Sequence, residues 1–228
     1  MSLEAKAGVD SNTIAPEAHK RRKLYSRRIA CFRRAHVAIY YVHGFGSCSQ
    51  ANEKKRLEMV QIFPGTPVHM LDYNSSSLYI DNVGALVHEV SKTSKETPFF
   101  IGSSLGGLYA RVLCSRYAGA NCALFNPVID PVSLLLGKVG RNINFCSGFP
   151  FEITEDVARS YSGYDGQISL HDHRMTVFVA IDDEILDPRG ITHYFMGRAE
   201  IIQIQGGHRI PSLMPYAEQL VLAREPTA

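Results

Sequence analysis

A serine between glycines, where a predicted strand turns into a predicted helix, is the first group of this sequence that could do chemistry. Gly102-Ser103-Ser104-Leu105-Gly106 fits the pattern G-x-S-x-G, in which a sharp strand-to-helix turn exposes the central side chain. The Ser104 hydroxyl would then stand at a helix N-terminus, where the Leu105 amide and the helix dipole can stabilise an oxyanion. The alternative is a glycine-rich turn whose small residues only permit close packing.

A serine hydroxyl is a weak nucleophile near neutral pH and needs a base that a carboxylate holds in place. In chains with this strand–turn–helix motif the acid comes next and the histidine last, each after a later strand. Asp183 follows the apolar run at 176–181, and His208 follows the apolar run at 200–204 and two glycines. This order predicts Ser104 as the nucleophile, His208 as the base and Asp183 as the acid.

The loop after the first predicted strand offers a second oxyanion donor. The stretch His43-Gly44-Phe45-Gly46 directly follows the apolar run at 37–42, a position from which a backbone N–H completes an oxyanion hole. We expect the Phe45 amide to act together with that of Leu105. We interpret His43 as a residue that holds this loop by hydrogen bonding, since a second base has no role to fill.

Other polar groups support different chemistry less well. The neighbours Asp182 and Asp187 remain alternatives to Asp183 as the acid. His171-Asp172-His173 could be a fragment of a metal site, but further ligands at a suitable spacing are missing from the sequence, which favours a polar turn. His193 is expected on a helix as a surface or packing residue. Because a GxGxxG or Walker-type loop is also missing, we expect neither a metal nor an organic cofactor.

Short apolar runs alternate with amphipathic stretches from residue 37 onward. Six of these runs are rich in β-branched or aromatic residues and are bounded by turn formers, as buried strands are. They lie at 37–42, 68–71, 98–101, 122–125, 176–181 and 200–204. Helical apolar stripes lie between them, and a helix with a weaker stripe is expected at 52–63. This alternation predicts an α/β fold with a mostly parallel sheet of about six strands and helices on both faces.

The 228 residues, 45% of them apolar, are enough for one well-packed domain. We assign the domain to 36–228 and expect 1–35 to form a basic, flexible arm, because residues 1–36 hold nine Lys or Arg against three Asp or Glu. The arm could contact nucleic acid or anionic lipid, although a solvated extension is the favoured interpretation. Residues 127–172 interrupt the alternation with an irregular aromatic stretch, which predicts a small lid insertion over the carboxyl ends of the strands.

Composition favours a cytoplasmic protein without a membrane span. The apolar runs fall short of the roughly 18 residues that would suggest a transmembrane helix. The five cysteines form neither a CxxC pair nor a metal-binding spacing, which predicts reduced thiols. Cys114 and Cys122 are expected to be buried in a helix and a strand, where free cysteine acts as a small apolar residue.

The stretches YYVHGFGS, PFFIGSSLGGLYA, ALFNPVIDP, IDDEILD and GGHR together resemble the YqiA/YcfP-like family of small bacterial esterases within the α/β-hydrolase superfamily. The similarity runs from about 37 to 222 and leaves the arm uncovered. It implies a compact α/β-hydrolase fold and carboxylesterase activity on short-chain or acyl-thioester substrates. It also implies a catalytic triad of Ser104, Asp183 and His208. Members of the family often carry glycine at the position of Asp182.

We therefore expect a serine hydrolase that cleaves carboxylic ester or thioester bonds of a small-molecule substrate through an acyl-enzyme. Two other classes of function remain open, because one fold hosts many chemistries. One is a non-catalytic α/β-hydrolase scaffold that binds a partner or nucleic acid through the basic arm. The other is an acyltransferase or C–C hydrolase that uses the same triad. Salt-sensitive nucleic-acid binding without esterase activity would indicate the former, and substrate profiling would identify the latter.

Overall fold

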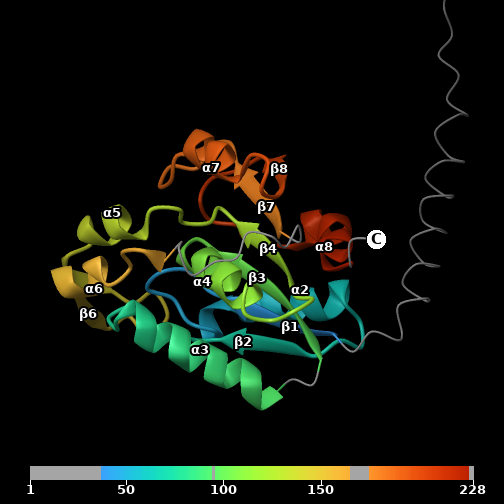
Figure 1. The fold of residues 1–228 in the computed structure, drawn as a ribbon, viewed down its shortest axis with the longest axis horizontal. Helices are drawn as coiled ribbons and strands as arrows, with labels where there is room; N and C mark the ends of the chain where they lie inside the picture. Colours follow the sequence, from blue (N-terminus) through green and yellow to red (C-terminus); the bar gives the residue numbers. More distant parts are fainter. Residues whose placement is uncertain (1–36, 94–95, 165–174, 226–228) are drawn as a thin grey trace, which may run out of the picture. The chain divides into compact units, whose positions relative to one another are not determined.

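Parallel strands form the central sheet of the computed structural model, which describes residues 37–93, 96–164 and 175–225. The strands are β1 (Val37–Val42), β2 (Val68–Leu71), β3 (Thr97–Ser103), β4 (Asn121–Phe125), β7 (Met175–Ala180) and β8 (Glu200–Ile204). They lie in the order β2-β1-β3-β4-β7-β8, and each neighbouring pair is parallel (Figure 1). All six carboxyl ends therefore meet at one edge of the sheet.

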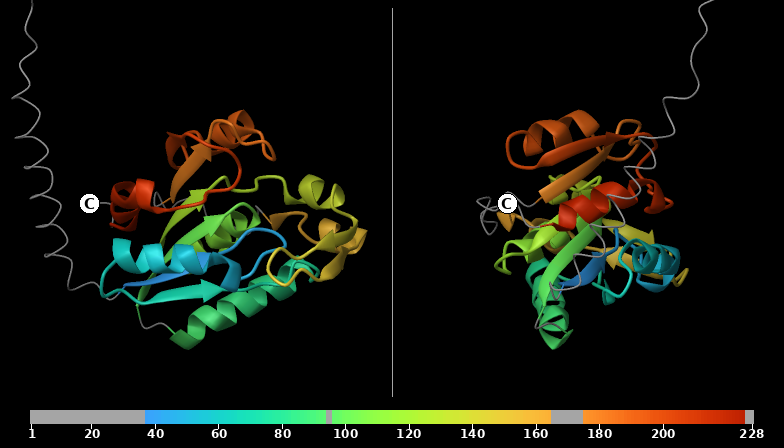
Figure 2. Two further views of the ribbon diagram at one scale, coloured as in Figure 1. Left: turned by 180° about the vertical axis from the view of Figure 1, so that it is seen from behind. Right: turned by 90° about the vertical axis from the view of Figure 1, so that its right-hand side faces the viewer.

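Helices cover both faces of the sheet, because parallel strands need crossover connections. They are α2 (Glu53–Ile62), α3 (Tyr79–Thr93), α4 (Leu105–Cys114), α7 (Pro188–Phe195) and α8 (Ala217–Arg224). Side chains of β1 point alternately to the two faces, so that Tyr40 and Val42 join one buried apolar cluster and Ile39 and Tyr41 join the other. Helices α3, α4 and α7 contribute side chains to the first cluster, and α2 and α8 contribute side chains to the second. Figure 2 shows the helices on the two sides of the sheet.

The predicted α/β architecture is confirmed, with small differences in the bounds of the strands. For example, β3 continues two residues beyond the apolar run at 98–101, because Gly102 and Ser103 still pair with Leu124 and Phe125 of β4. None of the helices in the described ranges combines the length and the hydrophobicity that crossing a bilayer would need. The predicted arm at 1–35 lies outside the described residues.

The segment between β4 and β7 contains α5 (Pro131–Leu136), an antiparallel hairpin of β5 (Gly140–Ile143) and β6 (Pro150–Ile153), and α6 (Glu155–Arg159). The part of the predicted insertion that lies before residue 165 is therefore more regular than the sequence suggested. The hairpin was missed because its strands are only four residues long and carry few apolar side chains. The last part of the predicted insertion, from residue 165, lies outside the described residues.

Cys48 and Cys146 form a disulfide, which corrects the prediction that the thiols are reduced. Their Cα atoms lie 5.8 Å apart, a usual spacing for a disulfide, although 98 residues separate them along the chain. No local spacing reveals such a pair, because the fold alone brings the two segments together. Cys114 and Cys122 are free and buried, as predicted, and Cys31 lies outside the described residues.

Candidate active site

Ser104 occupies the sharp turn between β3 and α4. Its backbone has φ 57° and ψ −123°, a conformation that residues other than glycine rarely adopt, and its amide donates to the Phe125 carbonyl at 2.9 Å. A Cβ atom on Gly102 would lie 2.3 Å from the carbonyl oxygen of Gly106, and one on Gly106 would lie 2.2 Å from that of His43. Both glycines are therefore needed for the tight approach of strand, helix and loop around the serine.

Ser104, His208 and Asp183 lie in hydrogen-bond contact although they follow three different strands. Nε2 of His208 is 2.9 Å from Oγ of Ser104, and Nδ1 is 2.8 Å from Oδ2 of Asp183. Because an ionised carboxylate only accepts hydrogen bonds, Nδ1–H donates to Asp183 and Nε2 is left to accept from the Ser104 hydroxyl. The contact arises because β3, β7 and β8 all end at the same edge of the sheet.

The Asp183 side chain is fully buried, with 0% exposed, whereas that of His208 is 13% exposed. Oδ1 of Asp183 accepts hydrogen bonds from the backbone amides of Ile185 and Leu186, both at 2.8 Å. Burial raises the pKa of the Asp183 carboxyl, but the hydrogen bonds from His208 and from these amides outweigh it and hold the pKa below its usual value. Asp183 is therefore ionised and fixed in place beside the imidazole.

The carboxylates of Asp187 and Asp182, the two alternative acids, lie in different surroundings from the carboxylate of Asp183. Asp187 is the N-cap of α7 and accepts hydrogen bonds from the amides of Arg189 and Gly190. Asp182 is exposed, and within the described ranges its carboxylate accepts no hydrogen bond. The geometry favours Asp183 as the partner of His208.

Two glutamates hold the loop that carries His208. Oε2 of Glu184 accepts from the His208 amide at 2.8 Å. On α2, the buried Glu58 accepts from the hydroxyl of Ser212 at 2.8 Å and from the amide of Leu213 at 2.7 Å. Glu184 thus fixes the loop at His208 itself, and Glu58 fixes it again at Ser212 and Leu213.

Asn126 links this loop to β7, and reasoning from the sequence missed it. Its fully buried side chain accepts from the Ala180 amide at 2.8 Å and donates from Nδ2 to the carbonyls of Gly207 and His208, at 3.3 and 3.0 Å. Ala180 lies three residues before Asp183. The side-chain amide of Asn126 therefore positions both the backbone that leads to the candidate acid and the backbone that carries the candidate base. An Asn directly after a predicted strand is a turn signal that could have identified the residue, and its φ is 45°.

The glycine loop, residues 43–48, lies against the serine. A Cβ atom on Gly44 would lie 3.4 Å from Cβ and 3.9 Å from Oγ of Ser104. Among the described residues, the amides of Phe45 and Leu105 donate to no acceptor. Both N–H groups are therefore available to an oxyanion formed at Ser104.

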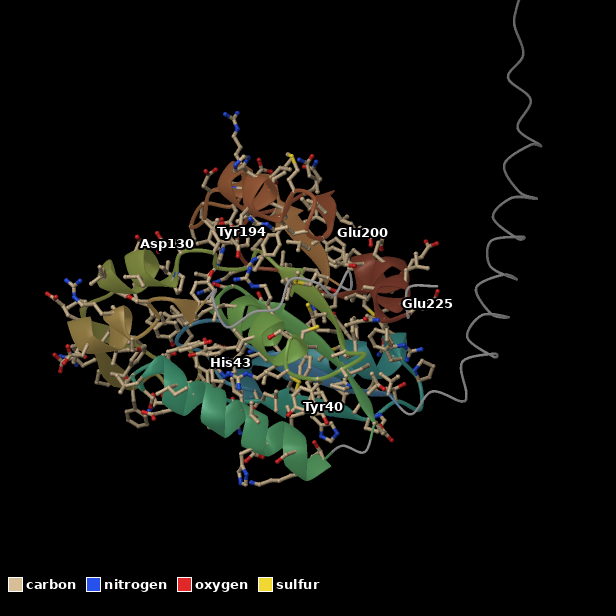
Figure 3. All side chains as sticks on the ribbon, in the orientation of Figure 1. Tyr40, His43, Asp130, Tyr194, Glu200 and Glu225 are labelled. Atoms are coloured by element: carbon tan, nitrogen blue, oxygen red, sulfur yellow. A yellow bond between two sulfur atoms is a disulfide. The ribbon has the colours of Figure 1, made fainter. Side chains whose placement is uncertain are left out.

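His43 is buried and fixes the glycine loop from within, as the sequence predicted (Figure 3). Its Nδ1 donates to the carbonyl of Gly44 at 2.9 Å, and its ring stacks on Tyr73 with centroids 4.7 Å apart. Nε2 lies 3.1 Å from Oδ1 of Asp72. The contact with His43 is the main reason that the pKa of Asp72 falls to about 2, and the hydrogen bonds from Ser49 lower it further.

The described residues contain no group of three or more His, Cys, Asp or Glu side chains that could hold a metal ion. The sequence candidate at 171–173 lies outside the described ranges.

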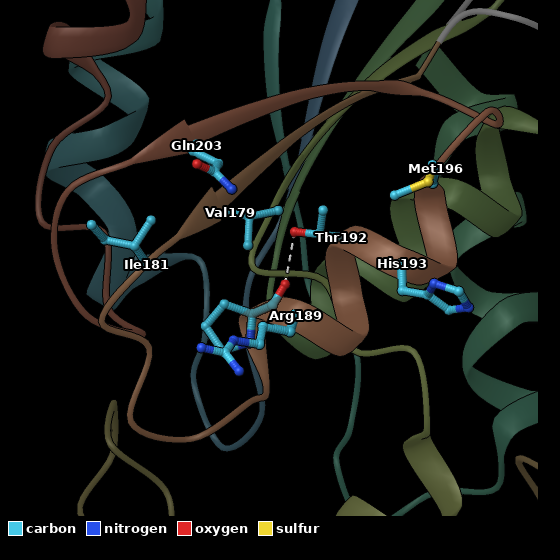
Figure 4. A pocket seen from close by; sticks show the side chains of 8 residues that line it. Val179, Ile181, Arg189, Thr192, His193, Met196 and Gln203 are labelled. Carbon is cyan, nitrogen blue, oxygen red and sulfur yellow. Dashed lines mark hydrogen bonds between the residues drawn. The ribbon is translucent and has the colours of Figure 1, made fainter.

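His193 lies on α7, as predicted, and lines a pocket of about 310 Å³ beside β7 and β8 (Figure 4). Thr192, in the same pocket, donates from Oγ1 to the carbonyl of Pro188 at 2.8 Å. The pocket is also lined by Val179, Ile181, Arg189, Met196 and Gln203. Ser104, Asp183 and His208 are not among its lining residues, so it is separate from the candidate active site.

Comparison with known families decides where the chain belongs. Residues 38–223 match the family described as "Uncharacterised protein family (UPF0227)". The chain belongs to the UPF0227 family. A UPF0227 protein of Klebsiella pneumoniae is 26% identical over 194 residues, which cover 80% of this chain and 96% of the relative. One of Shewanella baltica is 23% identical over 193 residues, covering 81% and 99%. The resemblance to the YqiA-like family, noted from the sequence, is confirmed.

Solved structures show the fold of this UPF0227 protein. One of the metagenome-derived lipolytic enzymes LipS and LipT superposes with a TM-score of 0.64 at 12% identity, covering 83% of this chain and 94% of that one. A monoacylglycerol lipase of Paleococcus ferrophilus superposes with a TM-score of 0.60 at 15% identity, covering 81% and 94%. The UPF0227 chain has the predicted α/β-hydrolase fold.

Proposed function

We propose that this protein is a serine hydrolase that cleaves carboxylic ester or thioester bonds through an acyl-enzyme. The observation that carries the proposal is the continuous relay in which Oγ of Ser104, the His208 ring and the carboxylate of Asp183 lie 2.9 and 2.8 Å apart. Such a relay converts a weak hydroxyl into a nucleophile, because the imidazole takes the proton as the oxygen attacks.

The geometry allows both halves of the reaction. Oγ of Ser104 attacks the carbonyl carbon while Nε2 of His208 takes its proton, and the amides of Phe45 and Leu105 stabilise the oxyanion. His208 then gives this proton to the leaving alcohol or thiol, and the acyl group stays on Ser104. Water attacks the acyl-enzyme with the same proton relay, which releases the carboxylic acid and restores the hydroxyl.

Asp183 lowers the barrier without changing its own protonation. Its carboxylate fixes the tautomer in which Nδ1 carries hydrogen, and it stabilises the imidazolium that forms during each attack. The depressed pKa of Asp183 keeps this charge in place at neutral pH. The lipolytic enzymes that share the fold are consistent with ester substrates.

Replacement of the serine tests the proposal. We expect Ser104→Ala to lower kcat/KM for p-nitrophenyl acetate by at least about 10⁴-fold and to abolish covalent labelling by a fluorophosphonate probe. The neighbouring Ser103→Ala is the matched control, because it removes a hydroxyl one residue away and should leave labelling intact. Full turnover and labelling in Ser104→Ala would refute the assignment.

A further inference from the structure

Ser75, in the loop that follows β2, holds the backbone of the glycine loop beside a candidate oxyanion donor. Its hydroxyl oxygen accepts a hydrogen bond from the Gly46 amide at 3.0 Å, and the residue is only 7% exposed. The Phe45 amide belongs to the preceding peptide group, and the two planar groups share the Cα atom of Phe45. A hydrogen bond that fixes one plane therefore restricts the orientation of the other.

The loop that carries Ser75 is itself fixed to α3. The Asn74 amide donates to Oδ1 of Asn82 at 3.1 Å, and Nδ2 of Asn82 donates to the Asn74 carbonyl at 2.9 Å. The buried Asn82 also donates from Nδ2 to the hydroxyl of Tyr109 at 3.0 Å. A helix therefore holds the backbone next to Ser75, so that the Ser75 hydroxyl is a fixed acceptor.

Asp72, at the start of the same loop, contacts the chain on both sides of Phe45. Its carboxylate accepts from the amide and the hydroxyl of Ser49, at 2.6 and 2.7 Å, and its Oδ1 lies 3.1 Å from Nε2 of His43. The Asp72 side chain is 55% exposed, so water can replace part of these contacts. Ser75 differs because its hydroxyl is buried and bonds to the peptide group next to Phe45.

We propose that Ser75 is a positioning residue for hydrolysis, whose hydroxyl orients the Phe45 amide toward the oxyanion formed at Ser104. This inference rests on the proposed function and adds to it the group that holds the oxyanion hole. Without the hydroxyl, the buried Gly46 amide loses its acceptor, so the glycine loop shifts to find another partner. The Phe45 amide then lies further from the oxyanion, and the transition state loses more stabilisation than the bound substrate does.

Two esters that differ in a single atom report on the oxyanion hole. They are p-nitrophenyl acetate and its thiono analogue, in which sulfur replaces the carbonyl oxygen. Sulfur is a weak hydrogen-bond acceptor, so the thiono ester gains little from the amides of Phe45 and Leu105. The measured quantity is the ratio of kcat/KM for the oxygen ester to that for the thiono ester. The kcat values are expressed per site that the fluorophosphonate probe labels to completion, which removes any loss of folded protein from the comparison.

We expect Ser75→Ala to lower kcat for p-nitrophenyl acetate about 5- to 20-fold with little change in KM, and to lower the ratio about 3- to 10-fold. Removing an oxyanion donor outright would cost more, because here the donor is displaced and not lost. Ser160→Ala is the matched control, since the Ser160 hydroxyl also accepts from the amide of a distant segment, that of Tyr79 at 3.0 Å. This control should leave kcat and the ratio unchanged, and melting curves check that both variants are folded.

The outcomes distinguish the positioning role from the proposed function. An unchanged kcat and ratio in Ser75→Ala, with an active wild-type protein, would overturn the role and leave the hydrolase standing. A lower kcat with an unchanged ratio would overturn it as well, because the loss would not arise at the oxyanion. Equal falls of the ratio in Ser75→Ala and Ser160→Ala would assign the effect to general destabilisation and reject the role. If the wild-type protein neither hydrolysed p-nitrophenyl acetate nor reacted with the probe, the proposed function would fail and the positioning role with it.

Discussion

Asn126 donates a hydrogen bond from its side-chain amide to the backbone carbonyl of His208, at 3.0 Å. The same side chain accepts from the amide of Ala180 at the end of β7. The backbone of the candidate base and the strand that leads to the candidate acid are therefore held by one buried residue. A small displacement of the imidazole would weaken the relay to Ser104, because such a relay depends strongly on geometry.

We expect Asn126→Asp to lower kcat for p-nitrophenyl acetate at least about 10-fold with little change in KM, because a carboxylate would face the carbonyls of Gly207 and His208 without a donor. A merely structural defect would not separate kcat from KM. Asn121→Asp is the control, since Asn121 is also buried and donates to two backbone carbonyls, those of Arg224 and Glu225. Equal losses of kcat in both variants would argue against a positioning role for Asn126.

The choice of acid can be tested with two neighbouring variants. Asp183→Asn should lower kcat by about 10³- to 10⁴-fold, because the amide no longer fixes the imidazole tautomer or stabilises the imidazolium. Asp182→Asn should change kcat less than about 3-fold, since the exposed carboxylate touches no group of the relay. Steady-state kinetics on one neutral ester measures both, and a larger loss in Asp182→Asn would transfer the role to that residue.

The glycines of the turn predict a contrast in stability. A Cβ atom on Gly106 would lie 2.2 Å from two backbone oxygens, so Gly106→Ala should lower the free energy of unfolding by about 3 kcal/mol or more. Gly84, on α3, has open space within 4 Å of the position that an added Cβ atom would take, and Gly84→Ala should raise the same free energy by up to about 1 kcal/mol. Urea titration compares them, and a fully stable Gly106→Ala would contradict the packing described.

The disulfide between Cys48 and Cys146 joins the glycine loop to the insertion and closes a long segment of chain. In the double variant Cys48→Ser and Cys146→Ser, we expect the free energy of unfolding under oxidising conditions to fall by about 2–4 kcal/mol, because the unfolded chain gains freedom. Dithiothreitol should destabilise the wild-type protein to a similar degree and leave the double variant unchanged. An effect of dithiothreitol of equal size on both proteins would show that the disulfide is not its cause.

Local features of the sequence were sufficient for the six strands of the central sheet and for the loops that carry the candidate site, although they did not reveal the hairpin of β5 and β6. Short β-branched runs and amphipathic stripes are properties of a few consecutive residues, so they predicted the six strands and the helices between them. Ser104, Asp183 and His208 could be named as candidates because each follows a strand, and the carboxyl ends of parallel strands share one edge whatever the loops between them contain.

Tertiary structure alone decided the contacts between segments that are distant along the chain. The pairing of Cys48 with Cys146 and the hydrogen bonds of Asn126 to the His208 loop link residues that lie 81 to 98 positions apart. No periodicity or local spacing encodes such partners, because they depend on the order of strands in the sheet and on the packing of loops beyond it. Sequence therefore determined which groups could react, and the fold determined which side chains hold them in place.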